Sequence, residues 1–252
     1  DLVVLIQSQN FRLDAFRIRM ELFALGLQTI EYVHVARMKE AEERTYLEAL
    51  AVSPKSLQEK SEGIVAALML APSIRVKHGE NELVFQGPFE DPKRNVGDYR
   101  GMPNKGGTFP IGEVFTEMKN LKLANGRCSV FAFADQDYKV QFFNPPFQIE
   151  LKDGQVELTG NEPELFKSVY ELVKATERPI IREIGFGLNE AISEATPVSD
   201  VTAFERQAGL HLSMGEKHAV YKKPEIDRSV GRYHVDLFIA MDELWIGNTR
   251  LV

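Results

Sequence analysis

The chain has 252 residues, of which 44% are hydrophobic and 27% are charged, and this composition excludes a disordered or low-complexity protein. Its formal net charge of −7 argues against nucleic acid as the main partner, because neutralising phosphates requires a basic surface. No stretch approaches the ~20 apolar residues that a membrane-spanning helix needs, so a membrane partner is not expected.

The single cysteine, Cys128, cannot form an internal disulfide, which favours a reducing, cytoplasmic location. It stands at the start of an apolar segment that is typical of a strand, so we expect a buried thiol, with a nucleophile as the alternative. The chain begins inside a predicted strand and lacks an initiating Met. We therefore expect a native N-terminus to be missing, and we do not expect a signal peptide.

The first third of the chain is typical of an α/β fold. Residues 2–6 form an apolar strand, and residues 13–25 carry apolar side chains at the 3.6-residue period of a helix with one buried face. Gly26 ends this helix and residues 29–35 form a second strand. A strand–helix–strand unit predicts parallel pairing. The turn after Ile6 contains no glycine, so no dinucleotide-binding fingerprint is present.

Two more helices are predicted at residues 37–50 and 61–70, and a β-hairpin at residues 74–86 turns at Gly79-Glu80-Asn81. The segment 87–110 is rich in Gly, Pro, Asn and Lys. Such a segment indicates either a domain boundary or a loop that carries function.

From Gly112 onward the pattern changes to α+β. Predicted strands and helices follow at residues 129–134, 138–143, 148–151, 156–159, 162–176 (a helix), 180–186, 210–214, 233–240 and, as a closing hairpin, 243–251. The chain is therefore predicted to have a shortened N-terminal α/β domain (residues 1–90) followed by a mixed β-sheet, α+β metal-binding domain (residues 91–252).

The segment Tyr-His-Val-Asp within the strand at 233–240 gives the sharpest chemical signal. Residues two apart in a strand share a face, so His234 and Asp236 point the same way. An imidazole and a carboxylate on one wall of an apolar strand can chelate a cation. The alternative is a buried His–Asp hydrogen bond.

Three more residues occupy apolar, glycine-flanked segments: Glu113, Glu183 and His211. A carboxylate is costly to bury there unless it is paired or coordinates a metal. Each has a structural alternative, which for the glutamates is an arginine partner such as Arg182. Together with His234 and Asp236 they supply two histidines and three carboxylates, the ligand set of a two-metal hydrolytic site.

Four motifs occur in the order found in the aminopeptidase T/aminopeptidase S family of metallopeptidases: Gly-Thr-Phe-Pro-Ile-Gly-Glu-Val-Phe-Thr (107–116), Glu-Ile-Gly-Phe-Gly-Leu-Asn (183–189), Gly-Leu-His-Leu-Ser-Met-Gly (209–215) and His-Val-Asp (234–236). The chain resembles this leucyl aminopeptidase-like family from about residue 100 to its C-terminus. The resemblance implies a dimeric, two-domain hydrolase that uses two divalent metals (Zn, Co or Mn) to remove N-terminal residues from peptides. It makes Glu113, Glu183, His211, His234 and Asp236 the ligands, with Glu113, or Glu183 as the alternative, also relaying the proton to the leaving amine.

One position departs from the family pattern. The family places a tyrosine shortly after the first histidine, whereas this chain has His218 there and Tyr221 three residues on. A weaker resemblance to the 2,5-dihydroxypyridine ring-cleaving dioxygenases gives the alternative of one Fe(II) on His211, His234 and Asp236, with His218 as an acid or base. A second alternative is a homologue that binds a ligand without catalysis.

The loop Arg-Gly-Met-Pro-Asn-Lys-Gly-Gly-Thr-Phe (100–109) leads directly into Glu113. We expect it to form part of a wall for a peptide or small-molecule substrate, with Arg100 or Lys105 meeting an anionic group. Tyr221 is the third predicted substrate contact. A solvated connection is the alternative for the loop.

Overall fold

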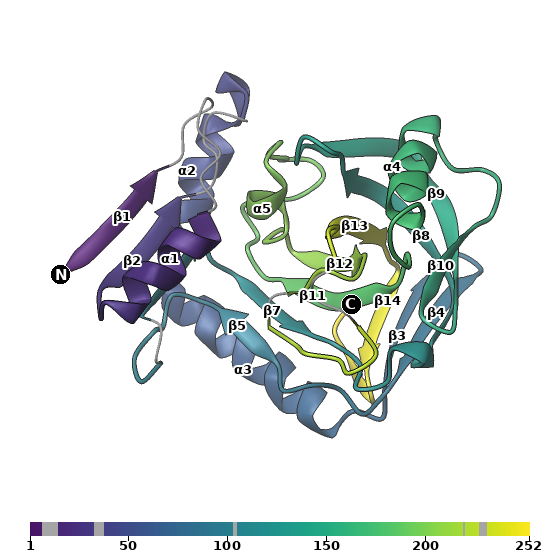
Figure 1. Cartoon of the computed structure of the whole chain (residues 1–252), viewed down its shortest axis with the longest axis horizontal. Helices are drawn as coiled ribbons and strands as arrows, with labels where there is room; N and C mark the ends of the chain where they lie inside the picture. Colours follow the sequence, from purple (N-terminus) through teal and green to yellow (C-terminus); the bar gives the residue numbers. More distant parts are fainter. Residues whose placement is uncertain (7–14, 33–37, 103–104, 219, 227–230) are drawn as a thin grey trace. The chain divides into compact units, whose positions relative to one another are not determined.

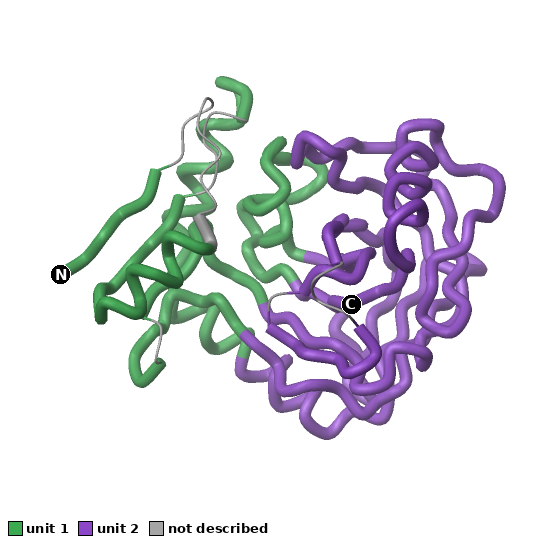
Figure 2. Tube along the Cα trace, in the orientation of Figure 1, with its two compact units in different colours: residues 1–61, 94–113, 187–208 green, residues 62–93, 114–186, 209–252 purple. Residues whose placement is uncertain are grey.

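The computed structural model describes residues 1–6, 15–32, 38–102, 105–218, 220–226 and 231–252. The chain divides into two compact units, each assembled from segments that are far apart in the sequence. Unit 1 contains residues 1–61, 94–113 and 187–208, and unit 2 contains residues 62–93, 114–186 and 209–252 (Figure 2). The expected domain boundary at residue 90 stays a prediction.

Unit 1 is built on a three-stranded parallel sheet with the order β1 (Leu2–Ile6), β2 (Gln28–Tyr32) and β6 (Gly106–Phe109) (Figure 1). Between β1 and β2 the chain forms α1 (Ala15–Ala24), which packs on β2. Gly26 follows α1 with a φ of 76°, a left-handed conformation that glycine adopts without a steric cost. The predicted parallel strand–helix–strand unit is confirmed, although the predicted helix start and the predicted end of the second strand lie outside the described residues.

The remaining helices of unit 1 in the described residues are short, except for α3 (Pro54–Leu70), which runs on into unit 2. They are η2 (Glu40–Glu42), α2 (Glu43–Ala51), α5 (Val201–Phe204) and the first part of α3. The sequence pattern predicts the last of these only from Ser61, but α3 begins at Pro54, because a proline fits the first turn of a helix. The buried Glu42 accepts hydrogen bonds from the backbone and hydroxyl groups of Ser199, which joins two distant chain segments of the unit.

Unit 2 is built on a large, mainly antiparallel sheet that curls round on itself (Figure 1). Its strands run in the order β15 (Thr249–Arg250), β14 (Glu243–Ile246), β3 (Ser73–His78), β4 (Asn81–Gln86), β8 (Ala124–Ala134), β13 (Val235–Ala240), β12 (Gly209–Met214), β11 (Ile181–Gly187) and β7 (Glu113–Thr116). Strand β9 (Val140–Lys152) pairs with β8 and with β10 (Gln155–Leu158). In the sequence, β5 (Lys93–Asn95) and Glu113 of β7 mark passages between the two units.

The predicted hairpins at 74–86, 148–159 and 243–251 are confirmed. The turn of the second is formed by Asp153 and Gly154, both with positive φ. The strands predicted at 138–143 and 148–151 prove to be one strand, β9. The β8–β9 register shifts opposite the segment that contains Pro145 and Pro146, so the two prolines fall where no ladder hydrogen bond is needed.

Helix α4 (Glu164–Lys174) contributes buried aromatic side chains to the unit 2 core. The ring of Phe166 lies 5.2 Å from that of Phe133 and 4.8 Å from that of Phe147, so that helix and sheet share one aromatic cluster. The order of helices and strands in the two units shows that the expected α/β and α+β class is correct. None of the helices in the described residues is long and apolar enough to cross a membrane.

Candidate metal centre

Three neighbouring strands of unit 2 carry the histidine and carboxylate signals predicted from the sequence. Glu183 lies on β11, His211 on β12 and Asp236 on β13, while His234 stands one residue before β13. Glu183, His234 and Asp236 each offer one ligand atom, and these three atoms lie within 4.8 Å of one another. Both carboxylates are buried, whereas the side chain of His234 is 30% exposed, so this wall of the sheet brings two buried anionic groups together with a partly exposed imidazole.

The ring orientation of His234 indicates how it can bind a cation. Its Nδ1 lies 3.1 Å from the carbonyl oxygen of Lys217, and because a carbonyl only accepts, Nδ1 carries the proton. In the neutral ring, Nε2 then presents a lone pair, and it lies 3.3 Å from Oδ1 of Asp236. Two acceptors at this distance need a positive charge between them, which is either a second ring proton or a metal ion. A ligating histidine commonly donates its other N–H to a carbonyl in this way.

Asp236 is oriented by a residue without a signal of its own in the sequence. The hydroxyl of Ser213, on β12, donates to Oδ1 of Asp236 at 2.5 Å. In the β12–β13 ladder Ser213 is directly opposite Asp236. Only the strand register, which the sequence pattern does not fix, identifies this partner.

His211 is fully buried, with Nε2 3.6 Å from Oε1 of Glu183. Its ring lies against the backbone of Gly185, where an added Cβ would come within 2.1 Å of two ring atoms. Glycine is therefore required two residues after Glu183. The glycine that flanks this glutamate in the sequence makes room for the imidazole.

His218 has the opposite tautomer to His234. Its Nδ1 accepts hydrogen bonds from the backbone N–H groups of Val220 and Tyr221, at 3.1 and 3.2 Å. In the neutral ring the proton is therefore on Nε2, which donates to Oε2 of Glu183 at 2.9 Å. His218 thus orients a carboxylate of the cluster.

The buried carboxyl groups are held in their charged forms. Burial by itself would raise the pKa of Glu183, but the nearby imidazole of His211, the hydrogen bond from His218 and the neighbouring His234 hold that pKa well below its usual range. Burial likewise opposes ionisation of Asp236, and His234, His211 and Ser213 together lower the pKa of this group. Deprotonated carboxylates are the form that binds a metal.

Glu113, the fifth predicted ligand, is the last residue of the central segment of unit 1. It is buried, and its Oε2 lies 2.5 Å from a guanidinium nitrogen of Arg206, from the same unit. Arg206 also donates to the carbonyl of Pro110. The arginine partner considered as an alternative for Glu113 is thus present, whereas Arg182 pairs with Glu117 and not with its neighbour Glu183.

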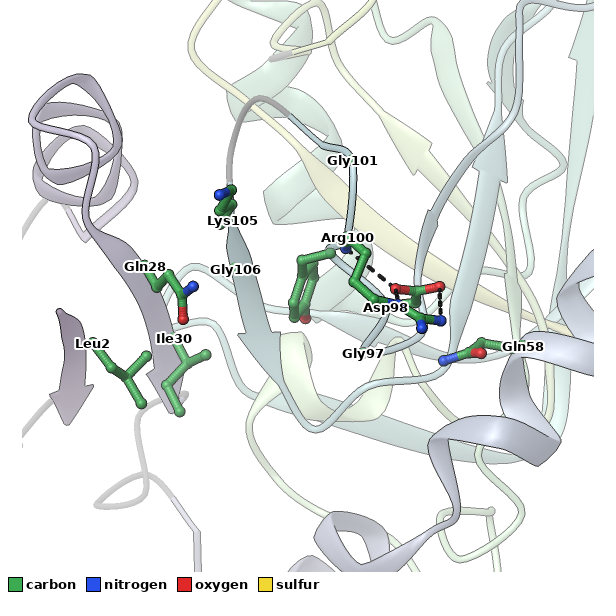
Figure 3. Close-up of a pocket in the computed structure, with 11 residues that line it drawn as sticks. Leu2, Gln28, Ile30, Gln58, Gly97, Asp98, Arg100, Gly101, Lys105 and Gly106 are labelled. Carbon is green, nitrogen blue, oxygen red and sulfur yellow. Dashed lines mark hydrogen bonds and ion pairs between the residues drawn. The ribbon is translucent and has the colours of Figure 1, made fainter.

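The predicted substrate contacts Arg100 and Lys105 line a cavity of about 580 Å³ within unit 1 (Figure 3). Arg100 forms a two-pronged ion pair with Asp98, at 2.9 and 3.1 Å. Leu2, Gln28 and Gly106 also line the cavity and begin β1, β2 and β6. The cavity is therefore at the amino-terminal edge of the parallel sheet, whereas ligands of such sheets usually bind beyond the carboxyl ends. The substrate role of both residues stays a prediction.

Tyr221, the third predicted substrate contact, and Cys128, the expected buried thiol, are both buried. The hydroxyl of Tyr221 donates to the carbonyl of Asp91 at 2.7 Å, and burial raises its pKa. Burial raises the pKa of the Cys128 thiol to about 12, which leaves it protonated at neutral pH and agrees with the expected buried thiol.

These features define an α+β protein with a curled antiparallel sheet and a buried histidine–carboxylate cluster. A solved structure described as wild-type AmpT from Thermus thermophilus is similar, with a TM-score of 0.58 over 96% of this chain and 71% of that chain. The two sequences are 13% identical, so the likeness shows a distant aminopeptidase T-like fold. No protein-family model and no curated protein matches the sequence.

Proposed function

We propose that the chain is a metal-dependent hydrolase that binds two divalent ions and removes N-terminal residues from peptides. The observation that carries the proposal is the position of His234, whose Nε2 lies 3.3 Å from Oδ1 of the Asp236 carboxylate while its Nδ1 donates to a backbone carbonyl. The aminopeptidase T-like fold supports the class of reaction, and the order of the sequence motifs supports the ligand set.

The residues of unit 2 that would hold metal are Glu183, His211, His234 and Asp236. Glu113 is the fifth ligand in the proposal, and the order of the sequence motifs supports this assignment. The bound ions, drawn from Zn, Co and Mn, supply an activated water and polarise the scissile carbonyl.

The chain's own groups supply orientation and proton transfer. His218 holds one oxygen of Glu183 through its Nε2–H, and Ser213 holds one oxygen of Asp236. Glu113 is the proposed proton carrier to the leaving amine, with Glu183 as the alternative. His218 stands at the family's tyrosine position, but its N–H already donates to Glu183. In this proposal it therefore does not perform the role of that tyrosine. It is a positioning residue in this proposal.

A mononuclear Fe(II) dioxygenase is the alternative function. His211, His234 and Asp236 form a set of two histidines and one carboxylate, and the histidine at the family's tyrosine position favours this reading. The additional buried carboxylate of Glu183 favours the hydrolase, because a three-residue iron site does not need it. A protein that binds a ligand without catalysis is the third reading. The homodimer and the cytoplasmic location remain predictions.

Metal content per chain, measured on protein purified without chelator or a nickel column, tests the proposal. Near two equivalents of zinc, cobalt or manganese would support it, and one equivalent of oxidisable iron would favour the dioxygenase. Protein that binds none of these metals, even after soaking, would contradict both. Turnover of aminoacyl-p-nitroanilides against oxygen uptake with dihydroxypyridines then separates the two enzymes.

Substitution of Asp236 by Asn tests the ligand assignment. We expect a loss of metal affinity of at least about 100-fold by calorimetric titration, because changes to orienting groups alone cost 10- to 100-fold. The matched control is Asp137→Asn, at an exposed turn between β8 and β9, which should bind metal as the unchanged chain does. Equal affinity in D236N and D137N would remove Asp236 from the ligand set.

A further inference from the structure

Arg182 is one of the largest fully buried side chains of the described residues, and it is next to Glu183 on β11. Successive side chains of a strand point to opposite sides, so the two neighbours meet different partners. Arg182 forms an ion pair with the buried Glu117. It also donates to two backbone carbonyls, those of Glu216 at 2.7 Å and Tyr221 at 3.0 Å.

These two carbonyls stand on either side of His218 in the sequence. On the same segment, the N–H groups of Val220 and Tyr221 close onto Nδ1 of the His218 ring. The guanidinium is a rigid planar fork of donors, so one side chain that binds both carbonyls fixes their separation. The backbone around His218 is thus held by Arg182, and the ring that it presents donates to Glu183.

A second buried cation, Lys223, also meets Glu117, the ion-pair partner of Arg182. Lys223 Nζ lies 3.5 Å from the second oxygen of Glu117 and 2.7 Å from Oε1 of Glu90, and it donates to the carbonyl of Met118. Glu216 and Lys223 are therefore both anchored by charged groups that meet at Glu117.

Burying this many charges is not an efficient way to stabilise a fold. Desolvation of an ion pair offsets most of its attraction, and apolar residues of similar volume often serve stability equally well. What apolar residues cannot do is bind two carbonyl oxygens at a fixed spacing. The arrangement is thus better explained by the geometry that it imposes on the segment around His218.

We propose that Arg182 is a positioning residue: by bridging the carbonyls of Glu216 and Tyr221 it keeps the Nε2–H of His218 on Glu183. The catalytic consequence rests on the proposed function, because Glu183 is a ligand only if metal binds. The positioning itself does not depend on metal.

The test uses the full chain labelled with ¹⁵N-histidine, without metal. The unchanged protein should give a His218 ring protonated at Nε2, and protected amides at Val220 and Tyr221. Arg182→Met should abolish the fixed tautomer signal and lower protection of the two amides at least about tenfold, because the segment then opens locally. Arg182→Lys, which keeps the charge but lacks the fork, should restore the signal only in part.

Loss of stability is separated from loss of position by the double variant Arg182→Met, Glu117→Met. It removes both buried partners, so folding stability should recover relative to Arg182→Met, while the His218 signal should stay lost. The matched control is Arg178→Met, which removes a half-exposed arginine from the Glu216 side chain and should leave the His218 signal unchanged. A double variant that keeps the Nε2–H signal and the amide protection would overturn the proposal.

The same set of variants distinguishes this proposal from the proposed function. Altered His218 signals in a protein that binds no metal would support positioning and contradict the hydrolase. Unaltered His218 signals in a protein that binds two metals would contradict positioning and support the hydrolase. If both hold, the double variant should lose about 10- to 100-fold in metal affinity, as expected for an orienting group.

Discussion

Two of the buried glutamates of unit 2, Glu117 and Glu183, have different partners. Glu117 meets the guanidinium of Arg182 and the ammonium of Lys223. Glu183 meets the imidazoles of His211 and His218, which are side chains that also bind metal ions. A carboxylate paired with fixed cations is already neutralised and is suited to holding backbone in place. A carboxylate among imidazoles can still accept a cation, so the neighbours decide which of the two can be a metal ligand.

Replacing each of the two glutamates by glutamine should give the largest difference in stability between the two clusters. Glu117→Gln leaves the buried Arg182 charge without its partner, and we expect a loss of about 3–5 kcal/mol in the free energy of unfolding. Glu183→Gln should cost less, about 1–3 kcal/mol, because imidazoles can remain neutral when the charge is removed. Urea unfolding of the metal-free proteins measures both. Equal losses in the free energy of unfolding would show that the two glutamates contribute equally to stability, which would contradict the comparison.

Acid gives the next test. The pKa values of Glu183 and Asp236 are lowered by their histidine neighbours, so each contributes stability above its unfolded pKa of about 4, and this contribution is lost as the pH falls towards the folded pKa. Burial raises the pKa of Glu117 despite Arg182 and Lys223, which gives a contribution of the opposite sign. The stability difference between the unchanged chain and Glu183→Gln should therefore narrow on going from about pH 6 to pH 3. A constant difference would contradict the lowered pKa.

Gly185→Ala tests whether the position of His211 beside Glu183 depends on its contact with Gly185. The new Cβ would fall within 2.1 Å of the ring, so the imidazole must move away from Glu183. We expect a loss of about 1–3 kcal/mol in the free energy of unfolding, as for other overpacked cores. Metal affinity should fall in the same protein. Unchanged stability and affinity would show that the ring is not held where the structure has it.

The smallest effect is expected for Gly63→Ala, the matched control for the previous substitution. Gly63 lies within α3, and an added Cβ there meets nothing within 4 Å. Alanine is the better helix former, so the free energy of unfolding should rise by about 0.5–1 kcal/mol. A loss of stability here would mean that the cost of Gly185→Ala is not specific to the His211 contact.

Local patterns predict most of this fold but little of the support around the site. The hairpins, the parallel unit and the strands that carry Glu183, His211 and Asp236 follow from apolar periodicity and from turn residues such as Asp153 and Gly154. These signals lie within a few residues of the structure that they predict. The late start assigned to α3 arose because its first turns are polar and lack an apolar period.

The partners that orient the candidate ligands come from distant segments. Ser213 is found only through the β12–β13 register, and Glu117 is 65 residues from Arg182. Glu113 and Arg206 meet across 93 positions (206 − 113 = 93). No local pattern encodes such pairings, and the sequence pattern therefore predicted an ion pair between Glu183 and Arg182 as the alternative, when both residues have other partners.

The division of the chain into interleaved segments bears on how this protein is made. Unit 1 contains residues 187–208 as well as the N-terminal 61, so no N-terminal fragment that stops short of residue 208 holds all of it. During synthesis, where domains generally fold in order as they leave the ribosome, the early part of unit 1 must wait until most of unit 2 has been translated. Contacts of such long sequence separation also slow folding. Truncations from the C-terminal side that extend past residue 208 should therefore disturb both units.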